Sequence, residues 1–245
     1  MRAGPERVVL KEGHAFNLIC LPFAGGSARS FVRLARYTPD WNVIGVQPPS
    51  GFAGGERGLD ALAHFYLGLL AADLRGPGIV FGHSLGAAVA HRMVQLRSRE
   101  WPEDLHVVLS APPVPETDTG ELLSLDDRAL LAATTRSGIL PDLGASDDLV
   151  LRFLLPDLRE DLAVLGRRGW QPASSGVPVH LLGGTDDLAC PPAALAQLAE
   201  RLGPLSTRLV EGGHMYAIER PADTAAALRD ISAALTAGNE VARAM

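Results

Sequence analysis

A serine between two glycines is the residue of this sequence best placed to do chemistry. Residues 82–86 read Gly-His-Ser-Leu-Gly and fit the pattern G-x-S-x-G, in which the serine occupies a sharp turn between a strand and a helix. An apolar run, 79–81, precedes the pattern, and an Ala-rich segment, 87–90, follows it. The glycines leave room for the strained backbone of such a turn. We therefore predict that Ser84 is the nucleophile of a serine hydrolase.

A serine nucleophile needs a base, and His214 is our candidate. In hydrolases with this turn the triad follows the chain order serine, acid, histidine. His214 lies in a Gly-rich loop, 211–215, directly after a predicted strand, 207–210, where it can reach over the carboxyl edge of a parallel sheet. Three other histidines after the serine lie within or beside predicted elements and are interpreted as core or surface residues: His91, His106 and His180.

The acid that orients the histidine is expected in the loop after the preceding strand, 178–182. Two adjacent aspartates stand there, Asp186 and Asp187. We favour Asp187, because it completes a G-x-x-D spacing from Gly184 and an apolar residue follows it. Asp186 completes the same spacing from Gly183 and stays open as the alternative.

Two backbone N–H groups are expected to form an oxyanion hole. Leu85 follows the serine at a helix N-terminus, where free N–H groups and the helix dipole favour a developing negative charge. The second donor usually comes from the loop after an early strand. That loop is 22–26, so Ala24 is our candidate and Phe23 the alternative.

Short apolar runs alternate with longer amphipathic segments along most of the chain. This alternation predicts a mainly parallel sheet covered by helices on both faces. Combined with the G-x-S-x-G turn, it leads us to expect an α/β-hydrolase fold. The expected strands are 17–21, 42–46, 79–81, 106–110, 178–182 and 207–210. The expected helices are 27–37, 59–74, 85–97, 193–202 and 222–235.

The segment from about 112 to 175 breaks this alternation. It holds helix-like pieces at 122–134, 147–155 and 159–166, without a convincing strand. We predict one domain over residues 1–245, with a core of about 1–111 and 176–245 and a helical lid inserted between them. Leucines and an isoleucine of this lid could line a hydrophobic acyl chamber, although helix packing is the better interpretation for most of them: Leu122, Leu123, Leu130, Leu131, Ile139, Leu140, Leu154 and Leu155.

The bulk composition favours a cytoplasmic enzyme or binding protein. The chain has 245 residues and a net charge of −6, and it lacks a block of basic residues, which argues against nucleic acid or an anionic membrane as the partner. It shows neither a signal-peptide core nor an apolar run of membrane-spanning length. The two cysteines, Cys20 and Cys190, sit in apolar stretches and are interpreted as buried free thiols. A monomer is our default expectation.

Nearly the whole chain resembles the type II thioesterases that accompany polyketide synthases and non-ribosomal peptide synthetases. The P-F-A-G-G-S block at 22–27 together with G-G-H-M at 212–215 is the most specific part of the resemblance. Its full extent is 21–27, Trp41, 47–49, 82–87, 110–113, 154–161, 183–187 and 212–215. One departure is Pro-Ser-Gly at 49–51, where the family usually has proline-glycine-arginine.

The resemblance implies hydrolysis of acyl thioesters on the phosphopantetheine arm of acyl or peptidyl carrier proteins. Such enzymes remove stalled or wrongly primed acyl groups, and some release products. It implies the triad roles for Ser84, the aspartate and His214, the oxyanion hole for Ala24 and Leu85, and no metal or organic cofactor. It also makes the helical insertion the lid over the substrate chamber.

Three rival functions share these residues. An esterase or lipase acting on free esters or acyl-CoA would use the same triad. A type I releasing or cyclising thioesterase would usually be fused behind a carrier domain, whereas the first strands here are expected within about 20 residues of Met1. A catalytically inactive hydrolase fold used for binding is the third, and the intact candidate triad disfavours it.

Overall fold

A seven-stranded sheet forms the centre of the molecule. The computed structural model describes residues 6–48, 58–115, 119–140, 146–165 and 170–243, so the departure at 49–51 lies outside it. The strand order is β1-β3-β2-β4-β5-β6-β7, and only β1 runs antiparallel to its neighbour. The strands are β1 Glu6–Lys11, β2 Phe16–Leu21, β3 Trp41–Gln47, β4 Gly78–His83, β5 Leu105–Ser110, β6 Val179–Gly184 and β7 Ser206–Val210. The predicted α/β class and mainly parallel sheet are confirmed.

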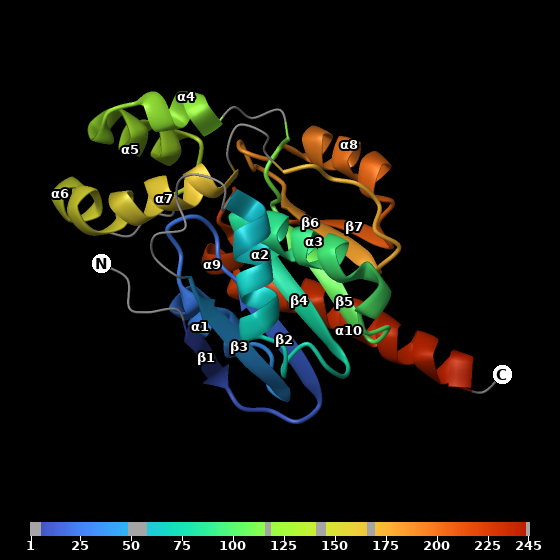
Figure 1. Ribbon diagram of the computed structural model, residues 1–245. Helices are drawn as coiled ribbons and strands as arrows, with labels where there is room; N and C mark the ends of the chain where they lie inside the picture. The colour runs from blue at the N-terminus through green and yellow to red at the C-terminus, as the bar shows by residue number, and fades with distance from the viewer. Residues whose placement is uncertain (1–5, 49–57, 116–118, 141–145, 166–169, 244–245) are drawn as a thin grey trace.

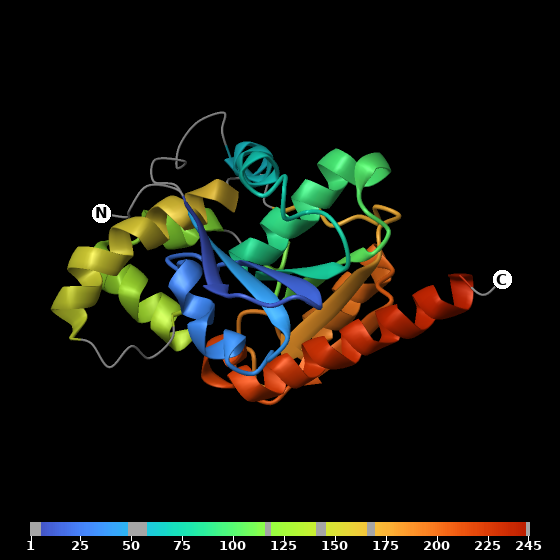
Figure 2. The same ribbon diagram turned by 90° about the horizontal axis from the view of Figure 1, so that it is seen from below.

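Helices cover both faces of this sheet (Figures 1 and 2). On one face lie α2 (Gly58–Leu69), α3 (Leu85–Arg97) and α8 (Pro192–Leu202), which share one buried apolar cluster. A second cluster fills the other face, under the short helices η1 (Ala28–Phe31), α1 (Val32–Ala35) and α9 (Tyr216–Glu219) and the long α10 (Pro221–Arg243). Strands β4, β5 and β6 are buried along their whole length, because helices pack on both sides of them.

Four further helical segments stand together at one end of the sheet (Figure 1). They are α4 (Thr119–Ser124), α5 (Asp127–Arg136), α6 (Asp147–Leu149) and α7 (Leu155–Leu165), with a π-helical segment η3 (Val150–Leu154) joining the last two. We call this group the lid. Arg159 of α7 ties its halves together by donating to the carbonyls of Leu123 and Leu125 and to the Asp127 carboxylate.

Several expected elements were wrong in their extent. The predicted helix 122–134 divides at Asp126, whose carboxylate accepts the Ala129 N–H at 2.8 Å and starts a new helix. The predicted pieces 147–155 and 159–166 form one continuous stretch from 147 to 165. The predicted helix 27–37 is a 3₁₀ turn followed by four α-helical residues.

Strand β1 was missed by sequence reasoning. It lies at the sheet edge with half-exposed residues on both faces, so it shows no clear apolar alternation. Its pairing partner, β3, lies more than thirty residues away, and a bulge shifts the register between Val9 and Lys11. Pairing with a distant strand therefore defines this element, and a local pattern does not.

In the described parts of the chain, no helix is long and apolar enough to cross a membrane.

A pair of buried histidines joins neighbouring strands on the sheet. His106 Nδ1 of β5 lies 3.0 Å from His180 Nε2 of β6, and the two rings stack. His180 Nδ1 lies 2.8 Å from the Ser206 hydroxyl of β7. Burial lowers the pKa of each histidine from 6.5 to about 4. Both imidazoles are therefore neutral structural groups at neutral pH, as expected for core histidines.

This pair predicts acid-sensitive stability. Between about pH 4 and 6.5 the unfolded chain binds more protons at these two sites than the folded protein. The free energy of unfolding should therefore fall as the pH is lowered through this window. Above about pH 6.5 the two histidines should make their full contribution to the free energy of unfolding. Urea unfolding of wild type and His180→Gln at several pH values should give a shallower pH dependence for the variant. The exposed-site control His64→Gln should keep the wild-type slope, and an unchanged slope in His180→Gln would contradict the assignment.

Candidate active site

The turn after β4 holds Ser84 in a strained conformation. Its φ is +53° and its ψ is −116°, and among the residues that the structure describes only Ala111 is another non-glycine residue with positive φ. A Cβ atom at position 82 would lie 2.2 Å from the Gly86 carbonyl oxygen, and one at position 86 would lie 2.2 Å from the Leu21 carbonyl oxygen. Both flanking positions therefore require glycine. The Ser84 N–H donates to the Ser110 carbonyl at 2.8 Å, which fixes the turn to β5.

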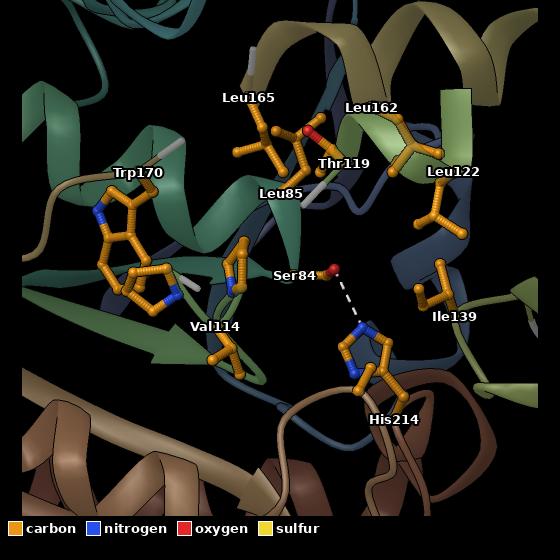
Figure 3. A pocket seen from close by; sticks show the side chains of 14 residues that line it. Ser84, Leu85, Val114, Thr119, Leu122, Ile139, Leu162, Leu165, Trp170 and His214 are labelled. Carbon is orange, nitrogen blue, oxygen red and sulfur yellow. Dashed lines mark hydrogen bonds between the residues drawn. The ribbon is translucent and has the colours of Figure 1, made fainter. Parts of the chain in front are cut away.

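Ser84, His214 and Asp187 form a continuous chain of hydrogen-bonding groups. Ser84 Oγ lies 3.0 Å from His214 Nε2, and Figure 3 shows the two side chains facing one another. His214 Nδ1 lies 2.9 and 3.0 Å from the two carboxylate oxygens of Asp187. The His214 and Asp187 side chains are almost fully buried. Asp187 Oδ1 also accepts the N–H groups of Ala189 and Cys190, each at 2.8 Å, so the loop after β6 holds the carboxylate in place.

Asp186, the alternative acid, points elsewhere. It lies on the exposed side of the same loop, and its carboxylate accepts the Thr185 hydroxyl at 2.8 Å. Thr185 in turn accepts the Gly212 N–H at 3.1 Å, so this pair holds the loops after β6 and β7 together. Geometry thus places Asp187 beside the histidine and gives Asp186 a bracing contact.

A second buried network lies behind His214, and sequence reasoning missed it. His83 Nδ1 lies 2.9 Å from the Ser110 hydroxyl, which lies 2.5 Å from the Tyr216 hydroxyl. The His83 ring lies 5.6 Å from both the His214 and the Tyr216 rings, measured between centroids. Burial lowers the pKa of His83 well below 6.5, and the nearby His214 lowers it further. A neutral His83 can pack behind the histidine loop without adding a competing charge. A polar Ser110 at the end of the apolar strand was the available signal.

The oxyanion-hole candidates lie beside the serine. Ala24 and Leu85 both line the pocket that contains Ser84 and His214. The Phe23 carbonyl accepts the Gly26 N–H at 2.8 Å, which closes a tight turn, and the end of β2 packs against Gly86. Leu85 is the first residue of α3, so its N–H lies at a helix N-terminus. Ala24 and Leu85 therefore remain our proposed donors, and Phe23 helps to shape the turn.

The pocket over Ser84 is bounded by the lid and by one tryptophan (Figure 3). Leu162 and Leu165 of α7 approach from the lid, and Trp170 lines another side of the pocket. The Trp170 indole N–H donates to His91 Nδ1 at 2.9 Å, so the His91 proton sits on Nε2 and is donated to the Ala173 carbonyl at 2.9 Å. Burial lowers the pKa of His91 to about 4, which keeps this arrangement neutral. The tryptophan wall is therefore rigidly held.

Only part of the predicted acyl chamber contributes to this pocket. Of the eight candidate residues, Leu122 and Ile139 line it. Leu130 and Leu155 are instead fully packed in the core cluster, as expected for helix packing.

The cysteines, Cys20 and Cys190, are free and buried. Burial, helped by the charge of Asp187, raises the pKa of the Cys190 thiol to about 12. No group of three or more His, Cys, Asp or Glu side chains in the described ranges is arranged to hold a metal ion.

Comparison with known proteins places this site in a family context. The family model described as "Thioesterase domain" matches residues 16–235. Thioesterase PikA5 of Streptomyces venezuelae is 34% identical over 217 residues, covering 82% of this chain and 75% of the relative. A probable cadicidin biosynthesis thioesterase of Streptomyces griseus is 30% identical over 225 residues, covering 84% of this chain and 59% of the relative.

A solved structure agrees with these sequence relatives. The type II thioesterase BorB from the borrelidin biosynthetic cluster superposes with a TM-score of 0.76 at 27% identity, covering 92% of this chain and 97% of that protein. The chain is therefore similar in both sequence and fold to thioesterases of biosynthetic pathways. The resemblance predicted from the sequence motifs is confirmed.

The adjacent aspartates offer a matched test of the acid. Asp187→Asn should lower kcat for p-nitrophenyl acetate strongly, because an amide cannot hold the imidazole in the required tautomer; the same change in a serine-protease triad costs about 10⁴-fold. Asp186→Asn should stay within about threefold of wild type, since that exposed carboxylate accepts the Thr185 hydroxyl, away from the His214 ring. Thermal unfolding would check that both variants fold. A larger loss in Asp186→Asn than in Asp187→Asn would overturn the assignment.

Proposed function

The chain belongs to the thioesterase family, and from this premise we propose that it hydrolyses acyl thioesters carried on the phosphopantetheine arm of acyl or peptidyl carrier proteins. The observation that carries the proposal is the ordered chain Ser84–His214–Asp187 at the base of a pocket under a helical lid. The relatives named above for cadicidin and borrelidin biosynthesis support a carrier-bound substrate. The role proposed is removal of aberrant acyl groups, or product release, in polyketide or non-ribosomal peptide biosynthesis.

In the acylation step, Ser84 attacks the thioester carbonyl. His214 Nε2, 3.0 Å from the serine hydroxyl, takes its proton as the Oγ–carbon bond forms. Asp187 stabilises the resulting imidazolium through Nδ1 and keeps the ring oriented. The negative charge moves to the carbonyl oxygen, where the N–H groups of Ala24 and Leu85 would bind it. One such donor is typically worth about 3 kcal/mol in the transition state.

Collapse of this intermediate breaks the carbon–sulfur bond. The imidazolium of His214 returns its proton to the departing pantetheine sulfur, which leaves as a thiol. An acyl ester on Ser84 remains. A water molecule then enters beside His214, gives its proton to Nε2 and attacks the ester carbonyl. The second intermediate releases a carboxylic acid and restores the serine hydroxyl. These steps use the triad side chains, the two backbone N–H groups, one water molecule and the acylated arm that the carrier brings.

The shape of the pocket supports an apolar acyl group. Leu162 and Leu165 of the lid face Ser84 from one side, and Val114 and Trp170 lie on another (Figure 3). Apolar lining favours the acyl chain and excludes bulk water from the reacting carbonyl, which strengthens the electrostatic interactions there. The lid helices thus provide the surface that would discriminate among acyl groups.

Replacing the serine tests the mechanism. Ser84→Ala should lower cleavage of an acetyl-carrier protein at least about 1,000-fold, because a triad without its nucleophile loses almost all of its acceleration. Ser98→Ala, an exposed serine just beyond the other end of α3, is the matched control and should keep wild-type turnover. Release of the acyl group is followed by intact-mass analysis of the carrier protein. Wild-type turnover by Ser84→Ala would refute the scheme.

The substrate class is tested by competition between leaving groups. We expect kcat/KM to be highest for the acyl-carrier protein, lower for the corresponding acyl-CoA and lowest for a p-nitrophenyl ester. Because the acyl-carrier protein and the acyl-CoA share both the acyl group and the pantetheine thioester, their ratio reports contacts with the carrier, whereas the ratio to the p-nitrophenyl ester also reflects the leaving group. Preference for the simple ester would favour a general esterase in place of the carrier thioesterase.

A further inference from the structure

A buried carboxylate of the lid contacts the loop that follows β2. Asp161 of α7 is 6% exposed, and its Oδ2 accepts the Gly25 N–H at 2.6 Å. The two residues are 136 positions apart in the chain, so this contact joins the lid directly to the loop that carries Ala24.

The position of Asp161 in the sequence is unusual for a carboxylate. On α7 it shares a stripe with Leu158, Leu162 and Leu165, all of which are buried. Leu162 and Leu165 line the pocket over Ser84, so this face of the helix looks toward the active site. A carboxylate on an apolar, buried stripe is costly unless it is hydrogen-bonded. The Gly25 N–H meets this requirement in part.

The loop contacted by Asp161 is a tight turn with two possible arrangements of its middle peptide. The turn runs from Phe23 to Gly26, is closed by the Gly26 N–H on the Phe23 carbonyl, and has Gly25 at φ +78°. A positive φ at the third position is the mark of a type II turn, whereas a type I turn has its middle peptide rotated the other way. The Gly25 N–H belongs to this middle peptide, so Asp161 holds the peptide in the type II orientation.

Apolar side chains of the lid also lie close to this turn. Gly25 has no side chain, and the space that its Cβ would occupy lies 3.5 Å from Leu154 of the π-helical segment and 3.6 Å from Leu158 of α7. Apolar side chains of the lid therefore lie beside Gly25, and the Asp161 hydrogen bond ties the lid to it. A shift of α7 would loosen both contacts at once.

We infer that Asp161 is a positioning residue for the oxyanion hole: by holding the Ala24–Gly25 peptide, it orients the loop whose Ala24 N–H faces the developing oxyanion. The inference rests on the proposed function. It adds that the geometry of the oxyanion hole depends on the contact between the lid and the loop after β2. Asp161 does not touch the substrate; it acts through the turn. Loss of this contact should weaken binding of the transition state more than binding of the ground state.

The test compares Asp161→Ala, which removes the acceptor, with Asp161→Asn, which keeps an oxygen at the same place. For an acyl-pantetheine thioester we expect Asp161→Ala to lower kcat by about 10- to 100-fold, less than the loss of an oxyanion donor itself, with KM changed less than threefold. Asp161→Asn should restore at least about a third of the wild-type kcat. Asp148→Ala, an exposed lid carboxylate, is the control and should leave both constants unchanged.

A second readout separates this inference from the choice of substrate. A fluorophosphonate probe reacts with Ser84 and places its phosphoryl oxygen in the oxyanion hole, whatever acyl group the enzyme prefers. Its labelling rate should fall in Asp161→Ala by a factor similar to kcat and recover in Asp161→Asn. If Asp161→Ala does not fold, Asp161→Ser, whose hydroxyl is too short to reach Gly25, takes its place.

The outcomes distinguish the possibilities. The inference is supported if the probe labels wild-type protein, the labelling rate falls in Asp161→Ala, and the rate recovers in Asp161→Asn. This holds even if carrier thioesters prove to be poor substrates. An unchanged labelling rate in Asp161→Ala overturns it while leaving the proposed function standing. A raised KM with unchanged kcat would also overturn it, because that pattern indicates a lid that shapes the pocket without orienting the oxyanion loop.

Discussion

The backbone turn that bears Ser84 is the constraint on which the rest of the site depends. Its positive φ is tolerated because two glycines let β4, α3 and the end of β2 approach to distances that any side chain would forbid. The same close approach brings the loop after β2 to the pocket over Ser84, which Ala24 and Leu85 both line. Strain at this turn is offset by the buried central strands β4 and β5, which end at His83 and Ser110, directly before the two positive-φ residues Ser84 and Ala111.

Around this turn, the polar groups are arranged so that each histidine has one task. His214 has a serine on one nitrogen and a carboxylate on the other. His83 and His91 are kept neutral by burial and serve as packing and hydrogen-bonding groups, one behind the histidine loop and one behind Trp170. Among these three histidines only His214 contacts both Ser84 and Asp187, and burial keeps His83 and His91 from adding a positive charge beside it.

Much of this arrangement could be predicted from the sequence, because it follows local patterns. The strand–turn–helix around Ser84 and the loop bearing His214 each depend on a few adjacent residues. Local spacing favoured Asp187 as the acid but left Asp186 open, since one step along a loop reverses the direction of a side chain. Strand β1 depends on pairing with distant β3, and the division of the lid helices depends on a cap at Asp126. Asp161 carried a signal, an acid on an apolar stripe, but its partner Gly25 is known only from the fold.

The central claim is that the acyl group is transferred from the carrier to Ser84 before it is hydrolysed. Detection of this acyl-Ser84 ester tests the claim most directly. Wild-type protein is mixed with an acylated carrier protein, quenched in acid within milliseconds to seconds, and measured by intact mass and peptide mapping. The account predicts a transient increase equal to the mass of the acyl group, located on the peptide that contains Ser84 and decaying as free acid appears. Acid release from the carrier without any acylation of Ser84, or acylation at another residue, would contradict it.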